Sequence, residues 1–102
     1  MATMVAQKAF QTKALAITGT AKAIASFGFS TAELTKADRA VITAFAQPVV
    51  IAVDGNTPTS TLGTYVGAND SITIDGNLNI NNLQIIKAGA TNSTASMTLY
   101  AF

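Results

Sequence analysis

The stretch that most constrains the fold is a short β-branched run that ends in a turn signal. Residues 49–53 read Val-Val-Ile-Ala-Val, and Asp54-Gly55 follows directly. Such a run has the usual length and composition of a strand and is too short for a stable helix. Asp-Gly favours a tight turn, because glycine readily adopts positive φ. The run therefore predicts a strand that ends at a turn, with Gly55 at positive φ.

Both faces of this predicted strand are apolar. Successive side chains of a strand point to opposite sides, so Val49 and Ile51 share one face, and Val50 and Ala52 share the other. We therefore expect burial on both sides, one of them in a contact between subunits. This makes Val50 and Ala52 candidate interface residues.

Similar short patterns recur along the chain, separated by glycine, proline, aspartate and asparagine. The expected strands cover residues 12–18, 21–27, 40–45, 49–53, 71–75, 78–85 with an interruption, and 96–102. Seven or eight short strands joined by turns predict an all-β, single-domain chain, folded as an antiparallel β-sandwich or jelly roll over residues 11–102. A helix is the competing prediction for 21–27, because alanine favours helices.

Three connecting segments have their own signals. Residues 30–33 read Ser-Thr-Ala-Glu, the spacing of a capping box, and predict a helical turn over 31–37. Within 78–85, the pair Leu78 and Ile80 and the pair Leu83 and Ile85 have opposite parity. A bulge or break at Asn81-Asn82 is therefore expected if both pairs face one core. Residues 56–69 are expected to be mainly loop.

The N-terminal residues 1–10 show no clean periodicity. They are expected to form either a frayed end or an arm that becomes ordered against a partner, with Val5 and Phe10 as candidate anchors. Tyr65, one of the few large apolar side chains of the 56–69 loop, completes the set of candidate interface residues.

Charge is scarce in this chain. Only 11% of its residues are charged, whereas about 25% is typical of soluble domains. Since charged residues are depleted at the cores of interfaces, assembly into a homo-oligomer is the favoured interpretation. The alternative is a monomer whose surface is covered by Thr, Ser, Asn and Ala. The net charge of +1 with dispersed lysines indicates no nucleic-acid partner.

The sequence also argues against a membrane segment. Its longest apolar run, residues 40–53, is interrupted at Gln47-Pro48 and is shorter than the roughly 20 residues that span a bilayer. Residues 1–8 lack the pattern of a signal peptide. The absence of cysteine fits a reducing compartment.

No catalytic, cofactor or metal site is expected. The chain has no histidine, so the commonest general base and the commonest transition-metal ligand are missing, and it has no cysteine for a thiolate metal site. Asp54, Asp70 and Asp75 would be candidates for a Ca²⁺ site, but their positions match ordinary turn chemistry better. Glu33 and Asp38 would be a candidate acid–base pair, but capping and solvation explain them better. We therefore expect no enzyme.

A carbohydrate site is a further alternative. Asn56, Asn69, Tyr65 and Tyr100 have side chains suited to sugar binding. The chain lacks tryptophan and has few aromatic residues, so its stacking surface would be poor.

A series of motifs follows in a fixed order from residue 40 to residue 100. They read Ala40-Val41-Ile42-Thr43, Val49 to Gly55, Thr57-Pro58-Thr59, Gly63, Gly67-Ala68-Asn69-Asp70, Ser71 to Gly76, Gln84 to Thr91, and Met97-Thr98-Leu99-Tyr100. This order and spacing resembles a family of small virion proteins of tailed bacteriophages. Members of that family often carry an arginine in the strand before Asp-Gly, where this chain has Ile51 or Ala52.

The resemblance implies a capsid decoration or cement protein. Such a protein would bind the major capsid protein on the outer surface of the phage head as a homotrimer, after synthesis in the host cytoplasm. Two alternatives remain open: another virion part, such as a head–tail connector or fibre-base subunit, and a carbohydrate-binding β-sandwich.

Overall fold

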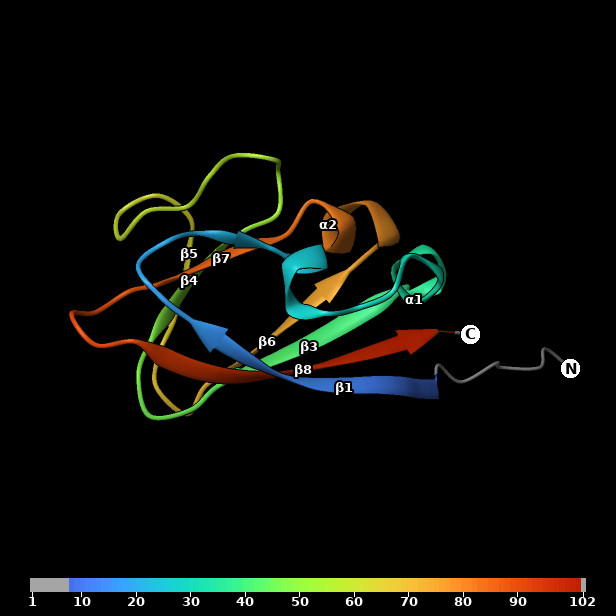
Figure 1. The fold of residues 1–102 in the computed structure, drawn as a ribbon, viewed down its shortest axis with the longest axis horizontal. Helices are drawn as coiled ribbons and strands as arrows, with labels where there is room; N and C mark the ends of the chain where they lie inside the picture. Colours follow the sequence, from blue (N-terminus) through green and yellow to red (C-terminus); the bar gives the residue numbers. More distant parts are fainter. Residues whose placement is uncertain (1–7, 102) are drawn as a thin grey trace, which may run out of the picture.

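The computed structural model of the chain describes residues 8–101, which form two antiparallel sheets of four strands each (Figure 1). The first sheet has the order β1-β8-β3-β6, and the second has the order β2-β7-β4-β5. The strands are β1 (Lys8–Ile17), β2 (Lys22–Ala23), β3 (Arg39–Ala44), β4 (Val49–Ala52), β5 (Thr64–Val66), β6 (Ser71–Asp75), β7 (Gln84–Lys87) and β8 (Ser93–Ala101). The predicted antiparallel β-sandwich is confirmed.

The strands pair in a nested order. β1 pairs with β8, β2 with β7, β3 with β6, and β4 with β5, all antiparallel. The pairs β1/β8 and β3/β6 belong to the first sheet, and the pairs β2/β7 and β4/β5 belong to the second. β8 consequently lies between β1 and β3, as expected for an apolar strand near the C-terminus.

The core lies between the sheets and follows the alternation of the sequence. In the first sheet Leu15, Ile42 and Leu99 are no more than 1% exposed. In the second sheet Ile51 is 2% exposed and Ile85 is 1% exposed. Burying such side chains is the main favourable contribution to folding, about 1.5–3 kcal/mol for each.

The second face of β4 is covered by the same chain. Val50 is 2% exposed and Ala52 is 9% exposed within one chain. The segment that connects β4 to β5 lies over Val50, since a Cβ added to Gly63 would be only 2.6 Å from Val50 Cγ1. Val50 and Ala52 are therefore core residues, and the expectation that a second subunit covers them is corrected.

Residues 21–27 are a strand only at their start. Lys22–Ala23 form β2, and Ile24–Phe27 form a 3₁₀ turn. The backbone N–H of Ile24 donates to the carbonyl of Leu83, and Ile24 is 2% exposed. The long strand predicted here is therefore wrong, because a contact with a distant segment holds Ile24 in place after two residues of sheet.

The interruption near Asn81-Asn82 exists, but its form differs from the prediction. Asn77–Asn81 form a short helix, α2, before β7 begins. Ile80 is fully buried, whereas Leu78 is 75% exposed. The premise that Leu78 and Ile80 face the same core is therefore wrong, because α2 turns them to different sides.

The bounds of two further segments differ from those predicted from the sequence. The predicted 56–69 loop contains β5, which pairs with β4. Residues 8–10 of the predicted N-terminal arm belong to β1, which pairs with β8 from Lys8 onward. Any arm would therefore end before Lys8; residues 1–7 lie outside the described part of the chain.

The capping box at the start of α1 (Thr31–Lys36) is confirmed. Ser30 Oγ accepts a hydrogen bond of 3.1 Å from the Glu33 backbone N–H, and Glu33 Oε1 accepts one of 2.8 Å from the Ser30 N–H. The other end of α1 is held by α2, because the Asn77 side-chain amide donates to the carbonyls of Leu34 and Ala37. These contacts satisfy carbonyls that a helix end otherwise leaves unpaired.

Candidate functional site: the outer face of the first sheet

The first sheet has one face in the core and one face that no other element of residues 8–101 covers. On strands β1, β8, β3 and β6, the residues that alternate with the buried ones are exposed or half-exposed. We call this surface the outer face. It consists of Thr12, Ala14, Ala16, Thr94, Ser96, Thr98, Tyr100, Arg39, Val41, Thr43, Ser71, Thr73 and Asp75. Figure 1 shows the second sheet and α2 on the opposite side of these strands.

Small and hydroxyl-bearing side chains form rows across the outer face. The strand register places Thr12 beside Thr98, Thr98 beside Val41, and Val41 beside Thr73. A parallel row contains Ala14, Ser96, Thr43 and Ser71. The resulting surface has small, similar side chains and few projections.

Neighbouring hydroxyls on this face bond to one another. The oxygens of the Thr12 and Thr98 side chains are 3.0 Å apart, and those of Thr43 and Ser71 are 2.7 Å apart. Burying a polar group is costly when its hydrogen bonds to water are lost without replacement. Hydroxyls that already bond to each other lose less when a partner covers them.

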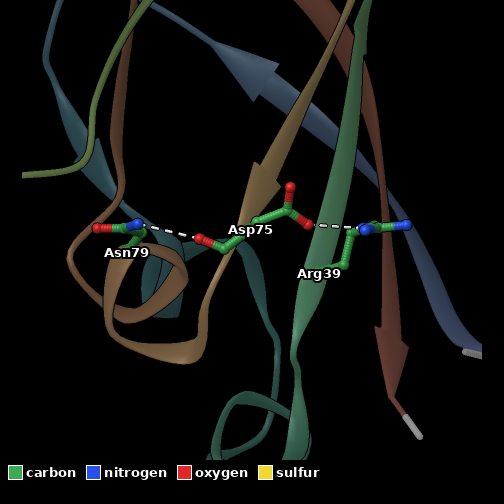
Figure 2. Close-up of polar contacts among 3 residues, drawn as sticks. All are labelled: Arg39, Asp75 and Asn79. Atoms are coloured by element: carbon green, nitrogen blue, oxygen red, sulfur yellow. Dashed lines mark hydrogen bonds and ion pairs between the residues drawn. The ribbon is translucent and has the colours of Figure 1, made fainter.

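Charge occurs only at one end of the outer face. Arg39 Nε and Asp75 Oδ1 form an ion pair at 2.6 Å, and the backbone carbonyl of Asp75 accepts a 2.9 Å hydrogen bond from the Asn79 side chain (Figure 2). The two side chains are 46% and 66% exposed, so the pair contributes little stability, about 0–1 kcal/mol. Because the pair joins one positive and one negative side chain, the outer face carries no net charge.

The candidate interface residues have different surroundings. Val5 lies outside the described residues. Phe10 is half-buried against the core, and Lys36 Nζ lies 4.2 Å from the centre of its ring. Tyr65 on β5 is 64% exposed and remains a candidate contact residue. Val50 and Ala52 are buried within the chain, as described above.

The acidic residues form local structure. The backbone N–H of Ser30, followed by the side chain of Gln11, lowers the pKa of Glu33. The backbone N–H and then the side-chain amide of Asn56 lower the pKa of Asp54. Within residues 8–101, no three acidic, histidine or cysteine side chains gather as they would to hold a metal ion. Asp54, Asp70 and Asp75 are not brought together.

The candidate sugar-binding residues are also dispersed. Tyr65 lies on an edge of the second sheet, and Tyr100 lies on the outer face of the first. Asn56 bonds to Asp54 in the connection after β4. The two tyrosine rings therefore lie on different sheets.

The outer face was not predicted from the sequence as one surface, although the sequence contains a pattern that indicates it. Thr, Ser and Asp alternate with Ile along 71–75, and Thr and Ser alternate with Met and Leu along 93–101. The alternation indicates an exposed side for each strand. Only the register shows that these sides join into one surface.

Comparisons with protein-family models, with curated proteins and with solved structures find no match for this chain. Among residues 8–101, no helix has the length and apolar character needed to cross a membrane.

Proposed function

We propose that this protein is a structural component of a tailed-phage virion, a capsid decoration or cement protein. It binds the major capsid protein on the outer surface of the head as a homotrimer and stabilises the shell. The motif order of residues 40–100, which resembles that of small phage virion proteins, motivates the proposal. The protein acts by contact and catalyses nothing.

The observation that carries the proposal is the outer face. This surface is uncovered by residues 8–101, is formed mostly by Thr, Ser and Ala, and has its only charges neutralised in the Arg39–Asp75 pair. Removing charges from water is the main cost of burying a polar surface. A face without free charge, on which two pairs of hydroxyls already bond to each other, is suited to close packing on another protein. We assign it as the surface that contacts the shell.

The nested strand pairing supports the same proposal. Pairs 1/8, 2/7, 3/6 and 4/5, distributed over two sheets, match the arrangement of a jelly roll, and we propose that classification for this sandwich. Jelly rolls occur in viral capsid proteins, and also in lectins and other proteins, so fold by itself leaves the function open.

Multivalent binding explains how a small face would hold a shell together. A contact made once is weak, but linked copies bind with a raised effective concentration. A trimer presents three outer faces to neighbouring capsid subunits.

The candidate arm, now limited to residues 1–7, would add a further contact. Deleting residues 2–7 is expected to leave the sandwich folded and to weaken binding to heads.

The test compares phage heads with and without the protein. Heads that carry it are expected to retain their genome to a higher temperature. Ala14→Lys and Thr73→Lys each place a charge on the outer face and should weaken binding to heads. Leu78→Lys is the matched control, because Leu78 is exposed on α2, away from that face.

Three outcomes would count against parts of the proposal. Equal genome retention with and without the protein refutes the cement function. Unchanged binding of Ala14→Lys and Thr73→Lys shows that another surface makes the contact. A copy number of about a dozen per particle, instead of hundreds, indicates a connector ring.

A further inference from the structure

β5 is an edge strand with an open side. Among the strands of residues 8–101 it pairs with β4 alone, through Val49 with Val66, Val50 with Tyr65, and Ile51 with Thr64. In the order β2-β7-β4-β5, no further strand from residues 8–101 follows it. An edge strand presents unpaired backbone N–H and C=O groups, which another extended chain can use. Tyr65, in the middle of β5, is 64% exposed.

A hollow lies at each end of β5. The first has a volume of about 210 Å³, and its apolar lining includes Ala52, Val53 and Leu62 beside Thr64. The second has a volume of about 230 Å³ and is lined from Tyr65 to Gly67 and from Asp70 to Ile72. Both are smaller than the roughly 300–1,000 Å³ of sites for small molecules, so each suits a single side chain.

The spacing of the hollows matches an extended chain. Thr64 borders the first hollow, and the second is bordered by Tyr65, Val66 and Gly67. From Thr64 to Gly67, just past the end of β5, the chain advances by three residues, which corresponds to about 10 Å of extended backbone. A segment of four to five residues running along β5 therefore reaches both hollows.

Each hollow carries one carboxylate and no basic side chain. Asp54 lines the first hollow and Asp70 lines the second. The Asp54 oxygens accept hydrogen bonds of 3.1 and 3.0 Å from Asn56, which favour its charged form. The Asp70 carboxylate accepts no hydrogen bond from residues 8–101 and lies beside Gly67, where an added Cβ would be 2.7 Å from Oδ2. The Asp70 carboxylate is therefore available to a cationic side chain of a partner.

We propose that β5 binds an extended segment of a partner protein as an added strand, with an apolar side chain in the first hollow and a lysine or arginine at Asp70. Backbone hydrogen bonds to β5 supply affinity, and the two hollows supply specificity. The inference goes beyond the proposed function, because the segment need not belong to a capsid protein.

The charges favour a different protein over a second copy of this chain. An antiparallel pairing of β5 with β5 of another copy would bring the Asp54 end of one strand toward the Asp70 end of the other. Asp54 and Asp70 lie outside the strand itself, but like charges brought close together repel each other. A partner segment with a lysine or arginine at the Asp70 end instead brings opposite charges together.

The test uses a displayed library of random heptapeptides selected against the full-length chain. We expect enrichment of peptides with an apolar residue and a lysine or arginine three or four positions apart. Binding of the selected peptide should weaken about two- to fivefold in Asp70→Asn, as for an exposed ion pair. Asp75→Asn is the matched control, since Asp75 is an exposed aspartate on β6 outside both hollows, and it should bind the peptide normally.

NMR shift changes on adding the peptide give an independent readout. Changes at residues 64–67 support the proposal, and changes confined to the outer face overturn it. Failure to enrich the predicted pattern, or equal binding by Asp70→Asn and wild type, also overturns it. If no peptide is selected and Tyr65→Lys abolishes self-association, the occupant of the edge is a second copy and the proposal is wrong.

Discussion

At the scale of single residues, Gly55 shows how the backbone sets the end of a strand. Its φ is +88°, as expected for an Asp-Gly turn after residues 49–53. A Cβ added at this position would meet nothing within 4 Å. Any cost of a side chain here therefore comes from backbone strain alone and not from a clash.

We expect Gly55→Val to reduce the free energy of unfolding by about 1–2 kcal/mol, the cost of a left-handed conformation for a residue with a Cβ. Gly89→Val is the matched control, because Gly89 also has open space around it but lacks positive φ. Its effect should remain within about ±0.5 kcal/mol. Urea denaturation measures both, and equal stabilities of the two variants would contradict the expectation.

Asn77 is a second residue with a large expected effect. Its amide nitrogen lies 2.8, 3.1 and 2.7 Å from the carbonyl oxygens of Leu34, Thr35 and Ala37. Asn77→Ala would remove this donor from the carbonyls of Thr35 and Ala37, whereas the Leu34 carbonyl keeps a hydrogen bond from the Asn81 side chain. An unsatisfied buried acceptor costs about 1–3 kcal/mol. Asn79→Ala, which removes one exposed bond, should cost clearly less. A smaller loss of thermal stability in Asn77→Ala than in Asn79→Ala would refute this role.

At the scale of elements, α1 depends on reciprocal capping. Helices this short are marginal by themselves, so the ends decide whether they form. Ser30 and Glu33 satisfy two donors at the N-terminus, and Glu33 also accepts a hydrogen bond from Gln11 of β1. Glu33 therefore ties the helix to the first sheet as well as capping it.

The capping carboxylate predicts a pH dependence. Its pKa is lowered from an ordinary value of 4.5, mainly by the Ser30 backbone N–H, with Gln11 and Lys13 contributing. A lowered folded-state pKa adds stability that is present above the unfolded-state pKa and is lost as the pH falls through the folded-state pKa.

Glu33→Gln retains a side chain that suits a capping box but removes the charge. We expect it to melt below wild type near neutral pH. This difference should shrink as the pH falls below about 4.5. Asp54, whose pKa is also lowered, contributes to the pH dependence of both wild type and Glu33→Gln, so its contribution cancels in the difference between their melting temperatures. A melting-temperature difference that stays constant down to about pH 3 would argue against a role for the charge.

At the scale of the whole molecule, burial within a single chain explains part of the scarcity of charged residues. The fully apolar strand β4 is buried on both faces by its own chain, so it gives no support for a subunit contact. The uncharged outer face and the exposed β5 edge remain as surfaces for association. The trimer thus stays a prediction that rests on the scarcity of charge and on the resemblance.

We expect purified protein at micromolar concentration to have three times the mass of one chain in light scattering. Ala14→Lys and Tyr65→Lys locate the contact, because they charge the outer face and the β5 edge separately. A monomer that also fails to associate on heads would refute the trimer.

The sequence by itself determined much, but not all, of the local structure. Alternating patterns identified β1, β3, β4, β6 and β8, the spacing from Ser30 to Glu33 identified the start of α1, and Asp54-Gly55 identified a turn. These features depend on contacts within a few residues or on the two-residue period of a strand. The class of fold followed from their number and spacing.

Only the tertiary structure decided which faces are covered and which strands are neighbours. In the folded chain, the segment between β4 and β5 covers Val50. β2 ends after two residues, where Ile24 bonds to Leu83. Leu78 on α2 faces solvent. The tertiary structure also joined the hydroxyls of β1, β8, β3 and β6 into one face and left β5 open. The reason is physical: these outcomes depend on contacts between residues far apart in the sequence, which local periodicity does not encode.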